Sequence, residues 1–144
     1  IFLIGGTLSL AKALETTGAG KLIADRVIGA LGENPSPVVF TFAVFILCCI
    51  MTNFMSNTAT TAMMAPICVS IAQGMGADPR AVLMACVIGG SCAYATPIGM
   101  PANTMVVGAG NYKFMHYVKS GMPLIVIATV ISMIILPIAF PFYP

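Results

Sequence analysis

Residues 52–61 of the chain read TNFMSNTATT, a cluster of amide and hydroxyl side chains that interrupts a long apolar run. The run extends from Asn34 to Ala77 and contains no Asp, Glu, Lys or Arg. A helix that crosses a bilayer needs about 20 apolar residues, so this run predicts one or two membrane segments. Polar groups at membrane depth persist only where protein buries them or where they line a cavity. We therefore predict that this first polar stretch is a binding site.

A second polar stretch, TPIGMPANT at residues 96–104, interrupts the next uncharged run, which extends from Ala81 to Tyr112. Its two prolines and the glycine between them cannot continue an α-helix. The pattern predicts a discontinuous span in which helix resumes at Asn103 and Thr104. Two such interruptions in one short chain indicate a transporter.

The composition places the chain in a membrane. Its 144 residues are 59% hydrophobic and only 7% charged, whereas a soluble domain carries about 25% charged residues. The apolar runs do not alternate as barrel strands do, so the predicted class is an all-α integral membrane protein. The net charge of +2 is small and scattered, and we expect no nucleic-acid partner.

The five cysteines all lie inside apolar runs, without the spacing of a metal site. We expect buried thiols that serve helix packing, and no cofactor apart from a coupling ion. The chain starts at Ile1 inside an apolar segment, with no signal-peptide pattern near it. We therefore expect residues 1–144 to be a single membrane domain from the C-terminal part of something longer.

The apolar arms on either side of the first polar stretch are too short to cross a membrane separately. Val38 to Met51 would span about 21 Å as a helix, while the hydrocarbon core is about 30 Å thick. Ala62 to Met75 forms a second arm of similar length. Two short arms that meet at a polar tip predict a re-entrant helical hairpin over residues 36–75.

Charge and punctuation predict the remaining elements. Leu22, Ile23 and Val27 recur at helical spacing opposite charged side chains, which predicts an interfacial helix on the membrane surface. Asp78 and Pro79 are a good cap and first residue for the next helix. The predicted elements are the end of an apolar helix at 1–14, the interfacial helix at 19–32, a broken helix at 80–109 whose first half runs to Ala95, a surface segment at 110–119 and a last span at 120–143.

The two polar stretches have the chemistry for an anion and a small cation. A helix N-terminus offers free N–H groups and roughly half a positive charge, which attracts anions. Ser56, Asn57 and Thr58 are good capping residues for a helix beginning near Ala59. The preceding arm ends in carbonyl oxygens that suit a cation, and the second stretch repeats the arrangement. Such a pair suits an anion carried together with Na⁺.

Less specific roles account for other polar residues. Ser and Thr in membrane helices often bond back to their own helix or to a neighbour, and we expect this for Thr60, Thr61 and Ser91. An amide at membrane depth is costly without a partner, which favours a functional role for Asn57 and Asn103. We expect His116 to lie beside the membrane.

Three blocks of the chain resemble the divalent anion:sodium symporter family, which contains sodium-coupled dicarboxylate, tricarboxylate and sulfate carriers. They are GGTLSLAKALETTGAGKLIA at 5–24, TNFMSNTATTAMMAPI at 52–67 and SCAYATPIGMPANTMVVGAGNYKFMHYVKSGMPL at 91–124. Ser56-Asn57-Thr58 matches the family's Ser-Asn-Thr signature. The family has two inverted repeats, each with one signature on a re-entrant hairpin, and this chain resembles the C-terminal repeat.

The resemblance implies the roles of particular residues. Asn57 and Thr58 would contact a carboxylate or sulfate, with Pro101 beside the substrate. Ser56 of the signature and Asn103 of the second stretch complete the expected substrate-binding set. A sodium site would consist of Thr52, Met55, Asn57 and Gly99, in part through backbone carbonyls.

The resemblance also implies partners and a location. The expected partners are lipid, sodium, a small anion, the N-terminal repeat and a second copy of the protein in a homodimer. The expected location is a bacterial inner membrane. The chain departs from many dicarboxylate carriers of the family at Met100, where they have Thr, and at Ala102, where they have Pro. Because Met cannot donate a hydrogen bond, both dicarboxylate and sulfate stay open as substrates.

Two other functions are alternatives to sodium symport. An arsenite or sodium/proton exchanger of the wider ion-transporter superfamily is the alternative, although proton coupling usually requires acids within the membrane. Asp25, Glu33 and Asp78 all lie at predicted surfaces. An intramembrane protease would need a catalytic pair that the spans lack, so we expect a transporter and not an enzyme.

Overall fold

The computed structural model describes residues 36–142 together with residues 17, 26 and 29. This part of the chain is helical and contains no strand, as the predicted all-α class requires. The predicted apolar segment at 1–14 and most of the predicted interfacial helix at 19–32 lie outside the described residues. The helices are α3 (Pro37–Thr52), α4 (Asn57–Gly74), α5 (Pro79–Gly90), α6 (Pro101–Ala109) and α7 (Phe114–Ala139).

Two helix starts follow from their capping residues. The Ser36 side chain accepts a hydrogen bond from the Val39 amide, and Pro37 occupies the first turn of α3. Asp78 accepts from the Arg80 amide in the same way at the start of α5. Such caps satisfy an N–H that the helix itself leaves without a partner, and each stabilises by about 1 kcal/mol.

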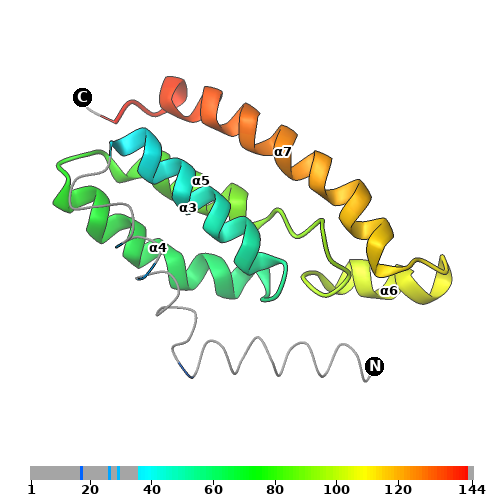
Figure 1. Cartoon of the computed structure of the whole chain (residues 1–144). Coiled ribbons are helices and arrows are strands. Elements are labelled where there is room, and N and C mark those ends of the chain that lie inside the picture. Colours follow the sequence, from blue (N-terminus) through cyan, green and yellow to red (C-terminus); the bar gives the residue numbers. More distant parts are fainter. Residues whose placement is uncertain (1–16, 18–25, 27–28, 30–35, 143–144) are drawn as a thin grey trace.

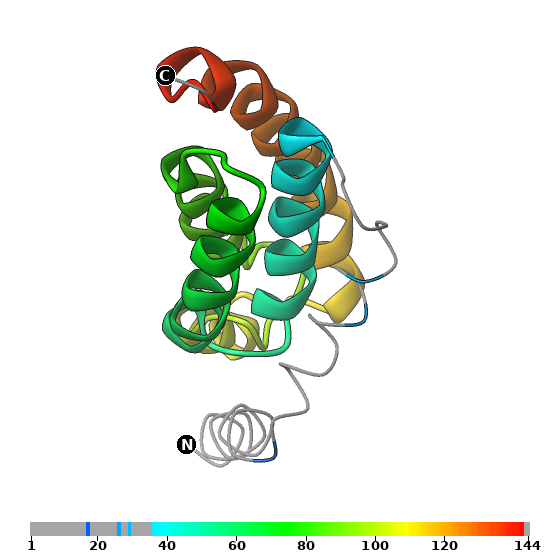
Figure 2. The same ribbon diagram turned by 90° about the vertical axis from the view of Figure 1, so that its left-hand side faces the viewer.

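Helices α3 and α4 form a hairpin whose tip is residues 53–56, and α5 packs against both arms. Figure 1 shows α3 running toward the tip and α4 running back from it. Helix α7 packs against α3 and α5, and Figures 1 and 2 show it on one side of them. Helix α6 has no buried residue. The described part is thus a three-helix core with α7 on one side.

The core consists of two clusters of apolar side chains. One lies among α3, α4 and α5, and the other links α3 and α5 to α7. The first contains the fully buried Phe40, Met64 and Val82. All five cysteines are free and buried, with Cys48, Cys68 and Cys86 in the first cluster and Cys49 and Cys92 in the second. The expected packing role of the thiols agrees with this placement.

Helix α7 alone, within the described part of the chain, is long and apolar enough to cross a membrane. Its 26 residues correspond to about 39 Å. It exposes a row of large aliphatic side chains, which include Ile127, Ile131 and Ile138. A contiguous apolar surface of this kind marks contact with lipid or with other protein.

Several predicted boundaries were wrong. Helix α5 ends at Gly90 instead of Ala95, because the backbone beyond it bonds to the hairpin tip. Helix α6 begins at Pro101 instead of Asn103, since proline without its N–H is well placed in a first turn. The second polar stretch nevertheless separates two helices, as predicted.

The last helix also begins earlier than predicted, at Phe114 instead of Ser120, and it ends at Ala139. The Lys113 amide donates to His116 Nδ1 at 3.3 Å, and the His116 amide donates to the Lys113 carbonyl at 2.9 Å. These bonds close the first turn of α7. Lys113 therefore lies at the N-cap of α7 and Lys119 inside the helix, where a separate surface segment at 110–119 was predicted.

Candidate functional site

The hydroxyl of Thr52 lies between two acceptor oxygens at the hairpin tip. Its Oγ1 is 2.7 Å from Asn57 Oδ1 and 2.6 Å from the carbonyl oxygen of Gly90. Thr52 is fully buried, and the three residues come from α3, α4 and α5. A hydroxyl has one proton, so it satisfies one of these acceptors at a time. One of these two oxygens is therefore without the hydroxyl proton at any moment, and such an oxygen is a suitable ligand for a cation.

Gly99 brings the second polar stretch against the tip. A Cβ placed on Gly99 would lie 2.5 Å from the Thr52 carbonyl oxygen and 3.1 Å from Asn53 Cα. Only glycine allows two backbones to approach this closely. Thr52, Asn57 and Gly99, three of the residues expected to bind sodium, are therefore brought together across the hairpin and the broken helix.

Met55, the fourth residue of the expected sodium site, lies in the tip with its side chain 3% exposed. The side chain is part of the cluster among α3, α4 and α5. Its amide donates to the Met51 carbonyl at 2.8 Å, which extends the end of α3 into the tip. The Met55 side chain is thus used in core packing, and its backbone lies at the hairpin tip.

Asn53 joins the tip to the segment between α5 and α6, and the sequence did not reveal this role. Its side-chain Nδ2 donates to the Cys49 carbonyl at 2.6 Å and to the Cys92 carbonyl at 3.4 Å. Its Oδ1 accepts from the Ala95 amide at 3.1 Å, and its backbone carbonyl accepts from Thr96 Oγ1 at 2.6 Å. Asn53 stands inside the quoted stretch, but three of these partners, Cys92, Ala95 and Thr96, lie about forty residues away in the sequence.

Asn103 holds the other side of the same segment. Its Nδ2 donates to the Ala93 carbonyl at 2.8 Å and to the Thr96 carbonyl at 3.1 Å. Thr104 Oγ1 donates to the Pro97 carbonyl at 2.6 Å. The side-chain amide of Asn103, a residue expected at the substrate, is thus used to hold residues 93–96 in place. Tyr117, which the sequence did not single out, donates from its hydroxyl to the Asn103 carbonyl.

Helices α4 and α6 both begin beside the tip with unpaired first-turn amides. In α4, the Ala59 amide donates to Ser56 Oγ and the Thr60 amide donates to the Ser56 carbonyl. The amides of Asn57 and Thr58 have no partner among the described residues. In the first turn of α6 the Thr104 amide donates to the Met100 carbonyl at 3.3 Å, while the backbone amides of Ala102 and Asn103 have no partner among the described residues.

The side chains of this region differ in exposure. Ser56 caps α4, as its residue type predicted, but the helix begins at Asn57 and not near Ala59. Ser56 and Asn57 are half-buried. Thr58 and Pro101 are exposed. The first turns of α4 and α6 therefore each carry a side chain that the described residues leave exposed.

The polar residues with less specific expected roles behave in two ways. Ser91 Oγ donates to the Val87 carbonyl at 2.8 Å, which is the expected bond back to its own helix. Thr60 Oγ1 is buried and has no partner among the described residues, so the expected bond is wrong for Thr60. Within the described residues, no group of three or more His, Cys, Asp or Glu side chains is placed to hold a metal ion.

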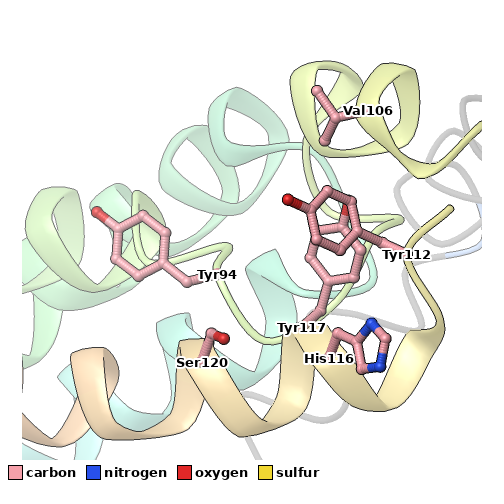
Figure 3. Close-up of a pocket in the computed structure, with 6 residues that line it drawn as sticks. All are labelled: Tyr94, Val106, Tyr112, His116, Tyr117 and Ser120. Atoms are coloured by element: carbon pink, nitrogen blue, oxygen red, sulfur yellow. The ribbon is translucent and has the colours of Figure 1, made fainter. Parts of the chain in front are cut away.

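Two hollows lie near the site without including its oxygens. The first, of about 310 Å³, is lined by Tyr94, Val106, Tyr112, His116, Tyr117 and Ser120. Figure 3 shows Tyr112, Tyr117 and His116 close together near the start of α7, with Tyr94 across the hollow. The Tyr112 ring meets the rings of His116 and Tyr117 edge to face, at centroid distances of 6.2 and 6.0 Å. The second hollow, of about 630 Å³, lies between α3 and α7 and is mostly apolar, with Asn53 and Thr96 in its lining.

The sequence of this chain is similar to the sequences of proteins that are named as transporters. It is 37% identical over 142 residues to the uncharacterized transporter YfbS of Escherichia coli, an alignment that covers 99% of the chain and 23% of that protein. It is 27% identical over 143 residues to the sodium-dependent dicarboxylate transporter SdcS of Staphylococcus saprophyticus, covering 96% and 27%. It is 31% identical over 122 residues to the Na(+)/citrate cotransporter of Rattus norvegicus, covering 85% and 21%.

The chain therefore spans less than a third of the length of each of these relatives. All three are named as transporters, which agrees with the predicted class of protein. The family described as the sodium:sulfate symporter transmembrane region matches residues 1–140. The resemblance found in the sequence is thus confirmed over almost the whole chain, and the chain belongs to this family of integral membrane transporters.

Proposed function

We propose that this chain is part of a transporter that carries a divalent anion, a dicarboxylate or sulfate, together with Na⁺. The single observation that carries the proposal is the junction of the two polar stretches, where Gly99 packs on the Thr52 carbonyl. In many secondary transporters the substrate and ion sites at membrane depth lie where the ends of broken helices converge. The two polar stretches converge in this way at the hairpin tip.

The oxygen-rich side of the junction is the proposed sodium site. Thr52 Oγ1, Asn57 Oδ1 and the Gly90 carbonyl share one hydroxyl proton at distances of 2.6–2.7 Å. A cation relieves the repulsion among unpaired acceptor oxygens. The relative named as a sodium-dependent dicarboxylate transporter supports Na⁺ as this cation.

The amide-rich side of the junction is the proposed anion site. The open amides of Asn57 and Thr58 in α4 and of Ala102 and Asn103 in α6 lie at helix N-termini, where the helix dipole favours an anion. The exposed Thr58 hydroxyl adds a donor beside Asn57. Asn57 belongs to both sides, with its side-chain oxygen toward the cation and its backbone N–H toward the anion.

The choice between dicarboxylate and sulfate depends on the start of α6. Met100 precedes this helix without a side-chain cap, and Ala102 is exposed. Neither side chain donates a hydrogen bond, so backbone amides would bind the anion there. Amides at a helix start suit either anion, and the relatives named for dicarboxylate and citrate support a carboxylate.

The same proposal includes the placement in the membrane. The arms α3 and α4, of 16 and 18 residues, measure about 24 and 27 Å. Both are shorter than the hydrocarbon core of about 30 Å, which supports a re-entrant hairpin. We infer that an N-terminal inverted repeat supplies the other half of the site, and that the whole protein is a homodimer in a bacterial inner membrane.

Uptake into proteoliposomes tests the function. The full-length protein that contains this chain is reconstituted, and entry of labelled succinate, citrate and sulfate is measured with an inward Na⁺ gradient or with choline in its place. We expect uptake of at least one of these anions with Na⁺ and only background uptake with choline. Equal uptake in both conditions rejects sodium coupling.

The site is tested by Asn57→Ala, which removes the side-chain oxygen that faces Thr52. Uptake should fall to background. Asn111→Gly is the matched control, because Asn111 is exposed, lies outside the junction and has a φ of 50° that glycine adopts freely. Wild-type uptake by Asn57→Ala would reject the proposed site.

A further inference from the structure

The side-chain amide of Asn53 makes three hydrogen bonds, two of which connect the hairpin tip with the segment between α5 and α6. Its side-chain Nδ2 donates to the Cys49 and Cys92 carbonyls, and its Oδ1 accepts from the Ala95 backbone amide. The side chain is 6% exposed. Cys49 belongs to α3, whereas Cys92 and Ala95 follow α5. A buried amide that bonds through both its nitrogen and its oxygen fixes the relative position of the elements that it joins.

The backbone of Asn53 makes a second connection, through Thr96. Thr96 Oγ1 donates to the Asn53 carbonyl at 2.6 Å and accepts from the Gly99 amide at 3.2 Å. Asn53 is therefore linked to Gly99 through one hydroxyl. Asn53 also follows Thr52 directly, and the Thr52 carbonyl is the oxygen against which Gly99 packs.

We propose that Asn53 is a positioning residue for sodium, which holds Thr52 and Gly99 at the separation that the ion requires. The proposal rests on the proposed function. It assigns to Asn53 no contact with the ion or with the anion. Its effect passes through the Cys92, Ala95 and Thr96 bonds to the backbone near Gly99.

The start of α6 has its own support, which allows the effect of Asn53 to be separated from a general distortion. Asn103 donates to the Ala93 and Thr96 carbonyls, and Tyr117 donates to the Asn103 carbonyl. None of these bonds includes Asn53. Loss of the Asn53 side chain should therefore change the sodium half of the junction more than the anion half.

Transport by the full-length protein in proteoliposomes tests the proposal. The sodium concentration for half-maximal uptake and the KM for the transported anion at saturating Na⁺ are measured for wild type and for Asn53→Ala. We expect the half-maximal sodium concentration to rise about tenfold and the anion KM to stay within about twofold, since one buried hydrogen-bonded group typically contributes about this much. An unchanged sodium requirement, or equal changes in both quantities, overturns the proposal.

Ser91→Ala is the control, because Ser91 lies in the same segment but its hydroxyl donates to the Val87 carbonyl of its own helix. It should behave as wild type. If Asn53→Ala does not accumulate in the membrane, Thr96→Val provides the test, since it removes the hydroxyl link between Asn53 and Gly99 and nearly preserves shape. We expect its half-maximal sodium concentration to rise about threefold, and no rise overturns the proposal.

Hydrogen–deuterium exchange of residues 91–100 separates this proposal from the proposed function. Sodium-independent uptake by the wild type would reject the function. The link made by Asn53 would still be measurable, because Asn53→Ala should speed amide exchange in this segment while Ser91→Ala should not. Unchanged exchange in Asn53→Ala, with or without Na⁺, overturns the role of Asn53 whatever the wild type transports.

Discussion

The Tyr117 hydroxyl donates a hydrogen bond of 2.9 Å to the backbone carbonyl oxygen of Asn103, and so joins α7 to the first turn of α6. Helix α6 has no buried residue of its own. Its position near the tip therefore depends on polar contacts of this kind. The long apolar α7 thus supports the start of the short α6, where two open amides lie.

Replacement of Tyr117 by Phe tests this support. The variant loses the hydroxyl and leaves the Asn103 carbonyl without that donor, so the free energy of unfolding should fall by about 0.5–1.5 kcal/mol. Thermal unfolding of the full-length protein in detergent measures the change. Tyr112→Phe is the matched control, because Tyr112 is exposed and packs on His116 and Tyr117 through its ring alone. Equal destabilisation by the two variants would contradict the role of the hydroxyl.

Gly121 provides a second test of how α7 is seated. A Cβ on Gly121 would collide with the backbone carbonyl of Tyr94 and with Ala95 Cα. Gly121→Ala should therefore push α7 away from this segment and cost about 1–3 kcal/mol, as overpacking does. Gly108→Ala in α6 is the opposite case, since nothing lies within 4 Å of its Cβ position and alanine favours a helix by about 1 kcal/mol. Thermal unfolding should rank Gly108→Ala at or above wild type and Gly121→Ala below it.

Thr52 and Thr60 are both fully buried, yet they differ in their partners. Thr52→Val removes a hydroxyl that serves Asn57 and Gly90, and should raise the half-maximal sodium concentration of uptake about tenfold, or about 1.4 kcal/mol. Thr60→Val removes a hydroxyl without a partner among the described residues. It should leave uptake unchanged, and the free energy of unfolding should stay the same or rise by at most about 3 kcal/mol. An equal rise in the half-maximal sodium concentration in both variants would show that the Thr52 oxygens do not form the ion site.

The sequence was sufficient to predict the features that depend on neighbouring residues. Ser36 with Pro37 and Asp78 with Pro79 start helices through caps that reach only two or three residues along the chain. The hairpin of two short arms follows from arm length and the polar interruption at its tip. The family signature identified Asn57, which the structure places beside Thr52.

The contacts of the junction depend on pairs of residues far apart in the chain, and no local pattern predicts them. The amide of Asn53 is indistinguishable in the sequence from that of Asn57, although Asn53 bonds to Ala95 while Asn57 faces Thr52. The end of α5 at Gly90 was missed for the same reason, since the bonds that replace helix beyond it come from the hairpin tip. Proline in the first turn of α6 was misread as a helix breaker.

The buried thiols provide a final prediction about the packing of the hairpin. Cys48 Sγ lies 3.8 Å from Cys86 Sγ in the core between α3 and α5, and all five cysteines are buried. Maleimide labelling of the folded full-length protein, followed by mass spectrometry of the peptides that carry these five cysteines, should show little modification until the protein is denatured. A Ser91→Cys variant reports the labelling rate of an exposed position in the same segment. Modification of Cys48 or Cys86 as fast as Ser91→Cys would mean that α3 and α5 separate in the folded protein, which would contradict a rigid core behind the site.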